Sequence, residues 1–400
     1  MARALRRGAR APVNCRLFAA GFRPMFLAAM VAAVLLVPVW AAVFVYGASL
    51  ANPWPPTLWH GHEMVFGFLG AAVAGFLLTA VPNWTGRPGI AGFPLAILAS
   101  LWLAARAAIA TAGWWPPAAV AAVDVSYFVL LAALIAPPLL RSGNRNAPLP
   151  AVVLLLAVCD AVFHWSLVHH DAVTAMRAIR AAIDIILVLA TLIGGRIVPA
   201  FTAGALRGSG VSLRTLRGID GVAIASMVAV LIVDLPAIDA RVAGVVAGLA
   251  AAAQFLRLAQ WRTLHVLGKP IVWILHLGYA WIGVGLALKC AALLGGYAAA
   301  AFWLHALTVG ALATLVVGVM SRAALGHTGR TLDLDGRTIV AYFLLMLAGL
   351  TRVFGLGVLP VAYPTVILIA AFLWTTAFTL LLWVYAPILW SARVDAGPAA

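Results

Sequence analysis

The ten residues WHGHEMVFGF, from Trp59 to Phe68, place two histidines and a glutamate in an otherwise apolar run. Polar side chains are costly in such a run unless something binds them. On a helix, His60 and His62 are separated by about 200° of rotation, so their side chains leave opposite sides. The pair therefore predicts either two centres, one on each side of the helix, or a helix that begins after His60.

Glu63 is the only glutamate in the sequence, and two explanations of it are equally good. It follows His60 by three residues and shares its helical face, so it can orient His60 or carry protons. Alternatively, it is a favourable carboxylate in the first turn of a helix.

Two further histidines, His164 and His305, fall at the same end of the apolar runs as His60 and His62. An ionisable group inside a bilayer costs at least about 2.5 kcal/mol unless it is paired or solvated. Imidazole is a common ligand of haem iron and of copper. We therefore interpret His60, His62 and His305 as metal or haem ligands.

Several arginines lie at a similar depth. If the cofactor is haem, its two propionates need positive partners. Pairing with Asp124 or Asp160 explains the arginines equally well. The candidates at a suitable depth are Arg106, Arg177 and Arg352.

The elements that must position these side chains are membrane helices. The chain has 400 residues, of which 65% are hydrophobic and only 9% are charged. Its apolar runs are long enough to cross a bilayer core of about 30 Å as helices. We predict an all-α, polytopic membrane protein with about twelve transmembrane helices, at 25–47, 58–82, 93–112, 117–140, 149–169, 174–200, 217–234, 240–259, 270–294, 299–321, 338–357 and 362–386.

The basic residues cluster in every second loop, which is the positive-inside pattern. Both termini are therefore expected in the cytoplasm, and His60 and His62 at the outer face. The formal net charge of +15 reports this topology and indicates no nucleic-acid partner. We expect a basic cytoplasmic tail at 1–24, one membrane domain at 25–386 in contact with the lipid bilayer, and a cytoplasmic tail at 387–400.

A short motif occurs twice. A glycine lies five residues after His62 and a Thr-Gly-Arg sequence begins 23 residues after it, and both recur at the same distances from His305. The offset between the copies is 243 residues, and half of it falls near Asp184, in the sixth predicted helix. The second, sixth and tenth helices thus look equivalent, which predicts three pseudo-repeated four-helix units.

Other chemistries are excluded by missing motifs. The three cysteines, Cys15, Cys159 and Cys290, are isolated, so the chain has neither a CxxC redox pair nor a CxxCH haem attachment site. It also lacks a Walker glycine loop, a GxSxG sequence and the HExxH of zinc proteases.

Six stretches resemble the signature sequences of the NnrS family: FRPMFL, WHGHEMVFGF, FLLTAVPNWTGR, WILHLGYAW, HALTVGAL and LGHTGR. The resemblance runs from Phe22 to about Trp390, with Gly61 standing where alanine is usual. It implies twelve membrane helices, haem, copper and a link to nitric oxide stress. It also carries over a polar signature without assigning metals, namely His60, His62, Glu63, His276, His305 and His327.

A more distant similarity is to the core subunit of haem–copper oxidases. That subunit also has twelve helices in three four-helix arcs, and it uses an HxH pair on one helix to serve two centres. Here the HxH pair lies on the second helix and a single histidine, His305, on the tenth, which is the reverse arrangement.

From these patterns we expect a haem–copper protein of the bacterial inner membrane that binds nitric oxide and reduces or scavenges it. We expect His62 and His305 as axial ligands of haem b, and His60 with His164 as copper ligands. Glu63 is the expected catalytic proton carrier. The remaining candidates for cofactor binding are His276, Arg106 and Arg352.

Two other functions remain open from the sequence. Twelve helices with buried charges also fit a transporter of a small solute, haem or copper, and a haem protein can act as a nitric oxide sensor without turnover. Because nothing in the chain holds a nicotinamide or a flavin, an enzyme would take electrons from a quinol or a small redox protein.

Overall fold

The computed structural model describes residues 16–214, 216–235, 238–297 and 300–394. Most of the expected N-terminal tail, residues 1–15, and the last residues of the C-terminal tail, 395–400, lie outside the described residues. The first long helix begins at Phe22 and the last ends at Trp390, so both extend slightly beyond the predicted membrane domain.

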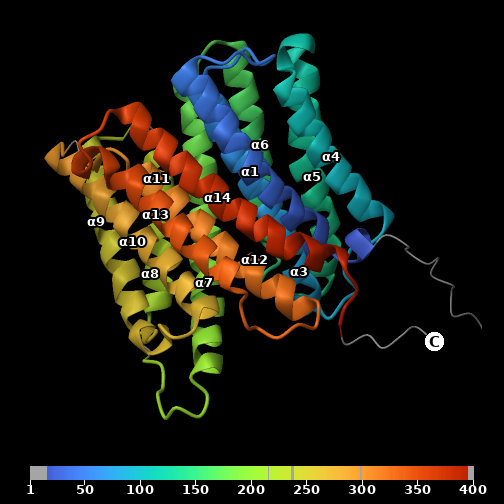
Figure 1. The fold of residues 1–400 in the computed structure, drawn as a ribbon, viewed down its shortest axis with the longest axis vertical. Helices are drawn as coiled ribbons and strands as arrows, with labels where there is room; N and C mark the ends of the chain where they lie inside the picture. The colour runs from blue at the N-terminus through green and yellow to red at the C-terminus, as the bar shows by residue number, and fades with distance from the viewer. Residues whose placement is uncertain (1–15, 215, 236–237, 298–299, 395–400) are drawn as a thin grey trace, which may run out of the picture.

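Helices make up nearly all of the described chain, and the predicted all-α fold is confirmed (Figure 1). Two of the long helices change their winding on the way, and each is therefore written as three segments. The long elements are α1 (Phe22–Tyr46), α2–η2–α3 (Pro56–His62, Glu63–Leu69, Gly70–Thr85), α4 (Phe93–Ala110), α5 (Pro117–Arg141), α6 (Leu149–Val168), α7 (Ala172–Ala205), α8 (Ile219–Asp234), α9 (Ala240–Ala259), α10 (Pro270–Gly295), α11–η6–α12 (Trp303–His305, Ala306–Ala313, Thr314–His327), α13 (Gly336–Val358) and α14 (Tyr363–Trp390).

Eleven of these helices are long and apolar enough to cross a membrane, by length and composition, among the described residues. The twelfth, α8, has 16 residues and falls at the place predicted for the seventh span. The chain is therefore a multi-pass membrane protein, as the length of its apolar runs requires.

The helices form one bundle in which the first and last elements lie side by side (Figure 1). The Arg23 guanidinium near the start of α1 donates hydrogen bonds to the carbonyl oxygens of Leu389 and Ser391, at 2.6 and 2.7 Å. Among the most buried spans are Pro56–Thr85, α7 and Trp303–His327. These are the second, sixth and tenth helices, which the sequence repeat marked as equivalent.

Two of these three central spans share an unusual backbone feature. Each contains a π-helical segment that starts directly after a histidine, η2 after His62 and η6 after His305. The starts of the two segments, Glu63 and Ala306, are separated by the same 243 residues as the sequence motifs. Because π turns are rare and concentrate at functional sites, their recurrence supports the repeat and marks both histidines.

Candidate functional site

His60 and His62 lie on a continuous helix, because α2 begins at Pro56, four residues before His60. Proline is well suited to the first turn, where its missing N–H has no helical partner. The two histidines therefore leave opposite sides of the span, as the spacing predicted, and each reaches a different site. We call the end of the bundle where this span begins the His62 end.

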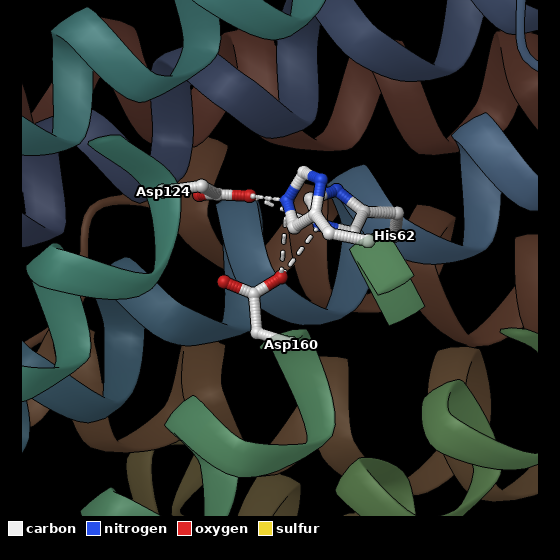
Figure 2. A group of neighbouring side chains, drawn as sticks. His62, Asp124 and Asp160 are labelled. Atoms are coloured by element: carbon white, nitrogen blue, oxygen red, sulfur yellow. Dashed lines mark hydrogen bonds and ion pairs between the residues drawn. The ribbon is translucent and has the colours of Figure 1, made fainter. Parts of the chain in front are cut away.

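The His62 ring enters an acidic cluster formed with α5 and α6. Its Nε2 atom lies 2.9 Å from Oδ1 of Asp160 and 3.0 Å from Oδ2 of Asp124. Figure 2 shows the two carboxyl groups approaching the same ring from different helices. His164 completes the group, with Nε2 3.1 Å from Asp124 and 3.6 Å from Asp160. All four side chains are buried.

The donor atoms of this cluster fit a metal ion. One ligand atom from each of His62, Asp124, Asp160 and His164 lies within 4.8 Å of the other three. Four ligands at about 2.1 Å from a tetrahedral metal lie about 3.4 Å from one another, close to the separations seen here. Two imidazoles and two carboxylates suit a divalent first-row metal, and copper(II) binds most strongly in that series.

The charge of the cluster leads to the same conclusion. Glu63 adds a third carboxylate, because its Oε1 lies 3.4 Å from Nδ1 of His62. One guanidinium, that of Arg106, donates to Glu63 at 2.7 Å and also to Asp124. Three carboxyl groups beside one guanidinium give a buried place an excess of acidic groups, for which a divalent cation is a suitable partner.

The neighbouring helix α4 fixes this arrangement through the π segment. Trp102 donates from Nε1 to the carbonyl oxygen of Gly67 at 3.0 Å, and Arg106 lies one turn further along the same face. A Cβ atom at Gly67 would stand 2.7 Å from Nη1 of Arg106. The glycine of the repeated motif therefore lets the guanidinium approach the backbone and still reach Glu63.

An aromatic side chain covers the cluster at the His62 end. The Trp54 indole makes edge contacts with His62 and His164, with ring centroids 5.4 and 5.5 Å apart. On its other side, Trp54 and His164 line a cavity of about 310 Å³ that also reaches His170 and Asp171 in the loop between α6 and α7. Through Trp54 and His164, the buried cluster therefore borders a cavity that is also lined by loop residues.

The His60 ring points instead into a cavity of about 300 Å³, at the small end of the range for ligand pockets. His305 and Arg352 line the same cavity. The ring of His60 stacks on Trp40, with centroids 4.1 Å apart and planes inclined by 22°, and its Nδ1 has no hydrogen-bond partner among the described residues.

This cavity has the features that a haem requires. Haem presents an apolar ring, an iron that takes imidazole ligands and two propionates that pair with arginine. The described lining contains no carboxylate and is otherwise mainly aliphatic and aromatic. Nη2 of Arg352 donates to the Tyr363 hydroxyl at 2.9 Å, whereas its buried Nη1 has no partner in the part of the chain that the structure describes. Two imidazoles and a partly unpaired guanidinium therefore face one apolar space.

The expected pairing of the histidines is exchanged. The structure groups His60 with His305, and His62 with His164, because the rotation of the span turns His62 towards α5 and α6. Glu63 contacts His62 and not His60, and it stands seven residues after the helix start, so the helix-start explanation does not hold.

Two other expected cofactor residues lie outside the cavity. The guanidinium of Arg106 is held by carboxylates of the acidic cluster and does not line the cavity. His276 lies near the far end of α7: its Nε2 is 2.7 Å from Oγ1 of Thr202 and its Nδ1 is 2.9 Å from Oγ1 of Thr263. Thr202 is roughly 35 Å along α7 from Ile179 in the cavity wall. Both nitrogens of His276 are therefore occupied by threonines, far from either site.

The sequence suggests Asp124 and Asp160 only as partners of arginine, whereas the structure places them in a group of four side chains that could hold a metal ion. One signal for Asp160 is present in the sequence, since it precedes His164 by four residues and so shares its helical face. Trp40 and Tyr363 gave no signal, because tryptophan and tyrosine are common at membrane interfaces.

Comparison with known proteins places the chain in a family. No curated protein matches it. A family model described as NnrS protein matches residues 16–393, which is nearly the whole chain and includes both histidine sites. The chain therefore belongs to the NnrS family.

Proposed function

We propose that this protein binds haem b between His60 and His305, binds copper at His62, Asp124, Asp160 and His164, and uses the two centres on nitric oxide. The observation that carries the proposal is the division of one HxH pair between two sites of different chemistry, an apolar cavity and a buried acidic cluster. Haem iron and copper, when bound, would each supply electrons for the reduction of a diatomic gas.

Reduction of two NO molecules to N₂O and water takes up two electrons and two protons. The side chain best placed to move a proton is Glu63, which lies between His62 and Arg106. We propose that Glu63 holds His62 in position and transfers protons, and that a quinol or a small redox protein supplies the electrons.

We further propose that the protein lies in the bacterial inner membrane with both termini in the cytoplasm, so that the His62 end faces outward. The loop cavity beside Trp54 then opens towards the outer medium. Protons would enter from that side, and the reaction would not pump them across the membrane.

The test uses purified wild-type protein. An optical spectrum with a Soret band, together with copper in an elemental analysis, is the expected result for cofactor content. Nitric oxide decay at an electrode, with a chemical reductant, measures turnover. Decay that stops at one or two NO per protein would leave a sensor or scavenger, and protein that takes up neither haem nor metal would favour a transporter.

A further inference from the structure

The first half of the long helix α7 has an apolar face and an adjoining polar face. Only the apolar face belongs to a site described above. Met176, Ile179 and Ile183 line the cavity of His60. Arg180 and Asp184 each follow a cavity residue by one position, so they point about 100° away, onto an adjoining face. That face carries a buried ionic group with no assigned role.

The group consists of Asp184, Asp234 and Lys289, from α7, α8 and α10. Nζ of Lys289 donates to Oδ2 of Asp234. Asp184 is 3% exposed and its carboxyl is in hydrogen-bonding contact with that of Asp234. The second oxygen of Asp184, Oδ2, is buried and has no partner in the described structure.

Two carboxyl groups in contact require a hydrogen atom between them, because two ionised carboxylates repel each other. Lys289 pairs with Asp234 and so leaves the contact between the two acids to be stabilised by a shared hydrogen atom. The cations that act on Asp184 are Lys289 and Arg180, the second on its own helix.

A purely structural role does not account for Asp184. The ion pair of Asp234 and Lys289 is complete without it. A third ionisable group with an unpartnered oxygen adds a cost of several kcal/mol inside a membrane. Groups of this kind in membrane proteins mark the paths of ions and protons.

The position of the group connects the surface with the interior. Asp234 is the last residue of α8, and its side chain is 14% exposed. Asp184 lies twelve residues into α7, near Cys159, which precedes Asp160 of the acidic cluster. On the opposite side, Lys289 and Arg180 both lie over the ring of Trp303, at 4.8 and 5.9 Å from its centroid, two residues before His305.

We propose that Asp184, Asp234 and Lys289 form a proton-holding site, loaded through Asp234 and discharged through the free oxygen of Asp184 towards the interior of the bundle. The group is suited to a proton and not to a metal cation, because the ammonium group of Lys289 already occupies the cation position beside Asp234. This inference rests on the proposed function in one respect only: the reduction of nitric oxide is the reaction that consumes the protons.

Infrared spectroscopy tests the site directly, because a protonated carboxyl absorbs apart from an ionised carboxylate and shifts when H₂O is replaced by D₂O. We expect one such band in the wild type at neutral pH and its loss in Asp184→Asn. Asp184→Glu should retain the band at a shifted position. A band unchanged in Asp184→Asn, in protein with wild-type haem and metal content, would overturn the proposal.

The matched control is Asp335→Asn. Asp335 caps α13 at its first turn, outside the membrane span, and hydrogen bonds from Arg337 hold the pKa of its carboxyl below the usual value. Because Asp335 is already ionised, its replacement should leave the protonated band in place. Loss of the band in this control as well would assign it to a general change of fold and would count against the site.

The role in proton supply is tested by nitric oxide decay in the same variants. Asp184→Asn should slow turnover by roughly a hundredfold, the effect of losing a positioned proton carrier, while Asp335→Asn should not. Turnover at the wild-type rate in Asp184→Asn would overturn the supply role. If the wild type itself consumes no nitric oxide, the proposed function fails, and the infrared result still decides the proton site.

Discussion

The two sides of the helix that carries His60 and His62 differ in charge. On the His60 side, the described lining of the cavity holds two imidazoles and the guanidinium of Arg352, with no carboxylate. On the His62 side, three carboxylates face a single guanidinium, that of Arg106. Two residues of sequence therefore separate a cationic, apolar environment from an anionic, polar one.

This difference shows how one short motif can select two ligands. An apolar ring with anionic substituents is favoured beside Arg352, and a small divalent cation is favoured among the acids. Both histidines are the same chemical group, so under the proposed assignment the selectivity would come from the helices that face them: α13 and α14 on one side, α5 and α6 on the other.

The strongest way to break the comparison is to remove one histidine at a time. We expect His60→Ala and His305→Ala each to lose haem, because each removes an imidazole from the cavity, and to retain the metal of the acidic cluster. His62→Ala should retain haem. Haem assay and elemental analysis of the three purified variants measure this. Haem loss in His62→Ala with retention in His60→Ala would restore the pairing first expected from the sequence.

The reciprocal change removes ligands on the acidic side. His164→Ala and Asp124→Asn should each weaken metal binding by more than roughly 10–100-fold. That range is typical when a residue that only hydrogen-bonds a ligand is replaced, whereas these two changes alter the proposed ligands themselves. Haem content should remain at the wild-type level. Copper titration of chelator-treated protein gives the affinity, and Cys159→Ala and Cys290→Ala serve as controls. Loss of copper in a cysteine variant, with retention in His164→Ala, would contradict the assignment.

Glu63→Gln sharpens the comparison by separating binding from reaction. Glutamine is nearly isosteric and can still accept a hydrogen bond from Arg106, so haem and copper should remain bound. Nitric oxide consumption should fall by roughly a hundredfold, since an amide cannot transfer the proton. The measurement is decay at an electrode with equal metal loading. A wild-type rate would limit Glu63 to orienting His62 and Arg106.

The smallest expected effect is on copper binding, when Gly67 beside the acidic cluster is replaced. In Gly67→Ala, the new methyl group would press on Nη1 of Arg106 and shift it from Glu63 and Asp124. We expect about tenfold weaker copper binding, the low end of the range for an indirect contact, and unchanged haem. The copper titration described above measures it.

Gly61→Ala is the matched control on the cavity side. There the new methyl group would lie 3.0 Å from the end of the flexible Ile179 side chain, which can rotate away. Both cofactors should remain at wild-type levels. A copper affinity reduced equally in the two alanine variants would show that the effect at Gly67 is not transmitted by Arg106.

The fold could be predicted from the sequence because bilayer thickness sets the length of an apolar run. Even α8, which is shorter than a usual span, falls where the hydropathy and the loop charges placed it. The opposite orientation of His60 and His62 followed from helical periodicity alone, and the repeat anticipated the equivalence of the two spans that carry π segments.

The partners of each histidine could not be predicted in this way. Which neighbour a side chain meets depends on the rotation of its helix about its own axis, and a span that is apolar on all sides leaves that rotation open. His276 illustrates the same difficulty, since its ring is held by Thr202, which is 74 residues away in sequence. No local spacing connects such residues.

The π segments also separate the two halves of their spans mechanically. Each residue of a helix turns the chain by about 100°, and a π turn accommodates one residue more than an α turn. The half of the span after Leu69 can therefore keep its packing in the bundle, while the half before Glu63 adopts its own angle about the axis. The same holds on either side of η6. A single-residue deletion within either segment would turn the histidine away from its site by about a quarter of a circle and leave the rest of the span in place.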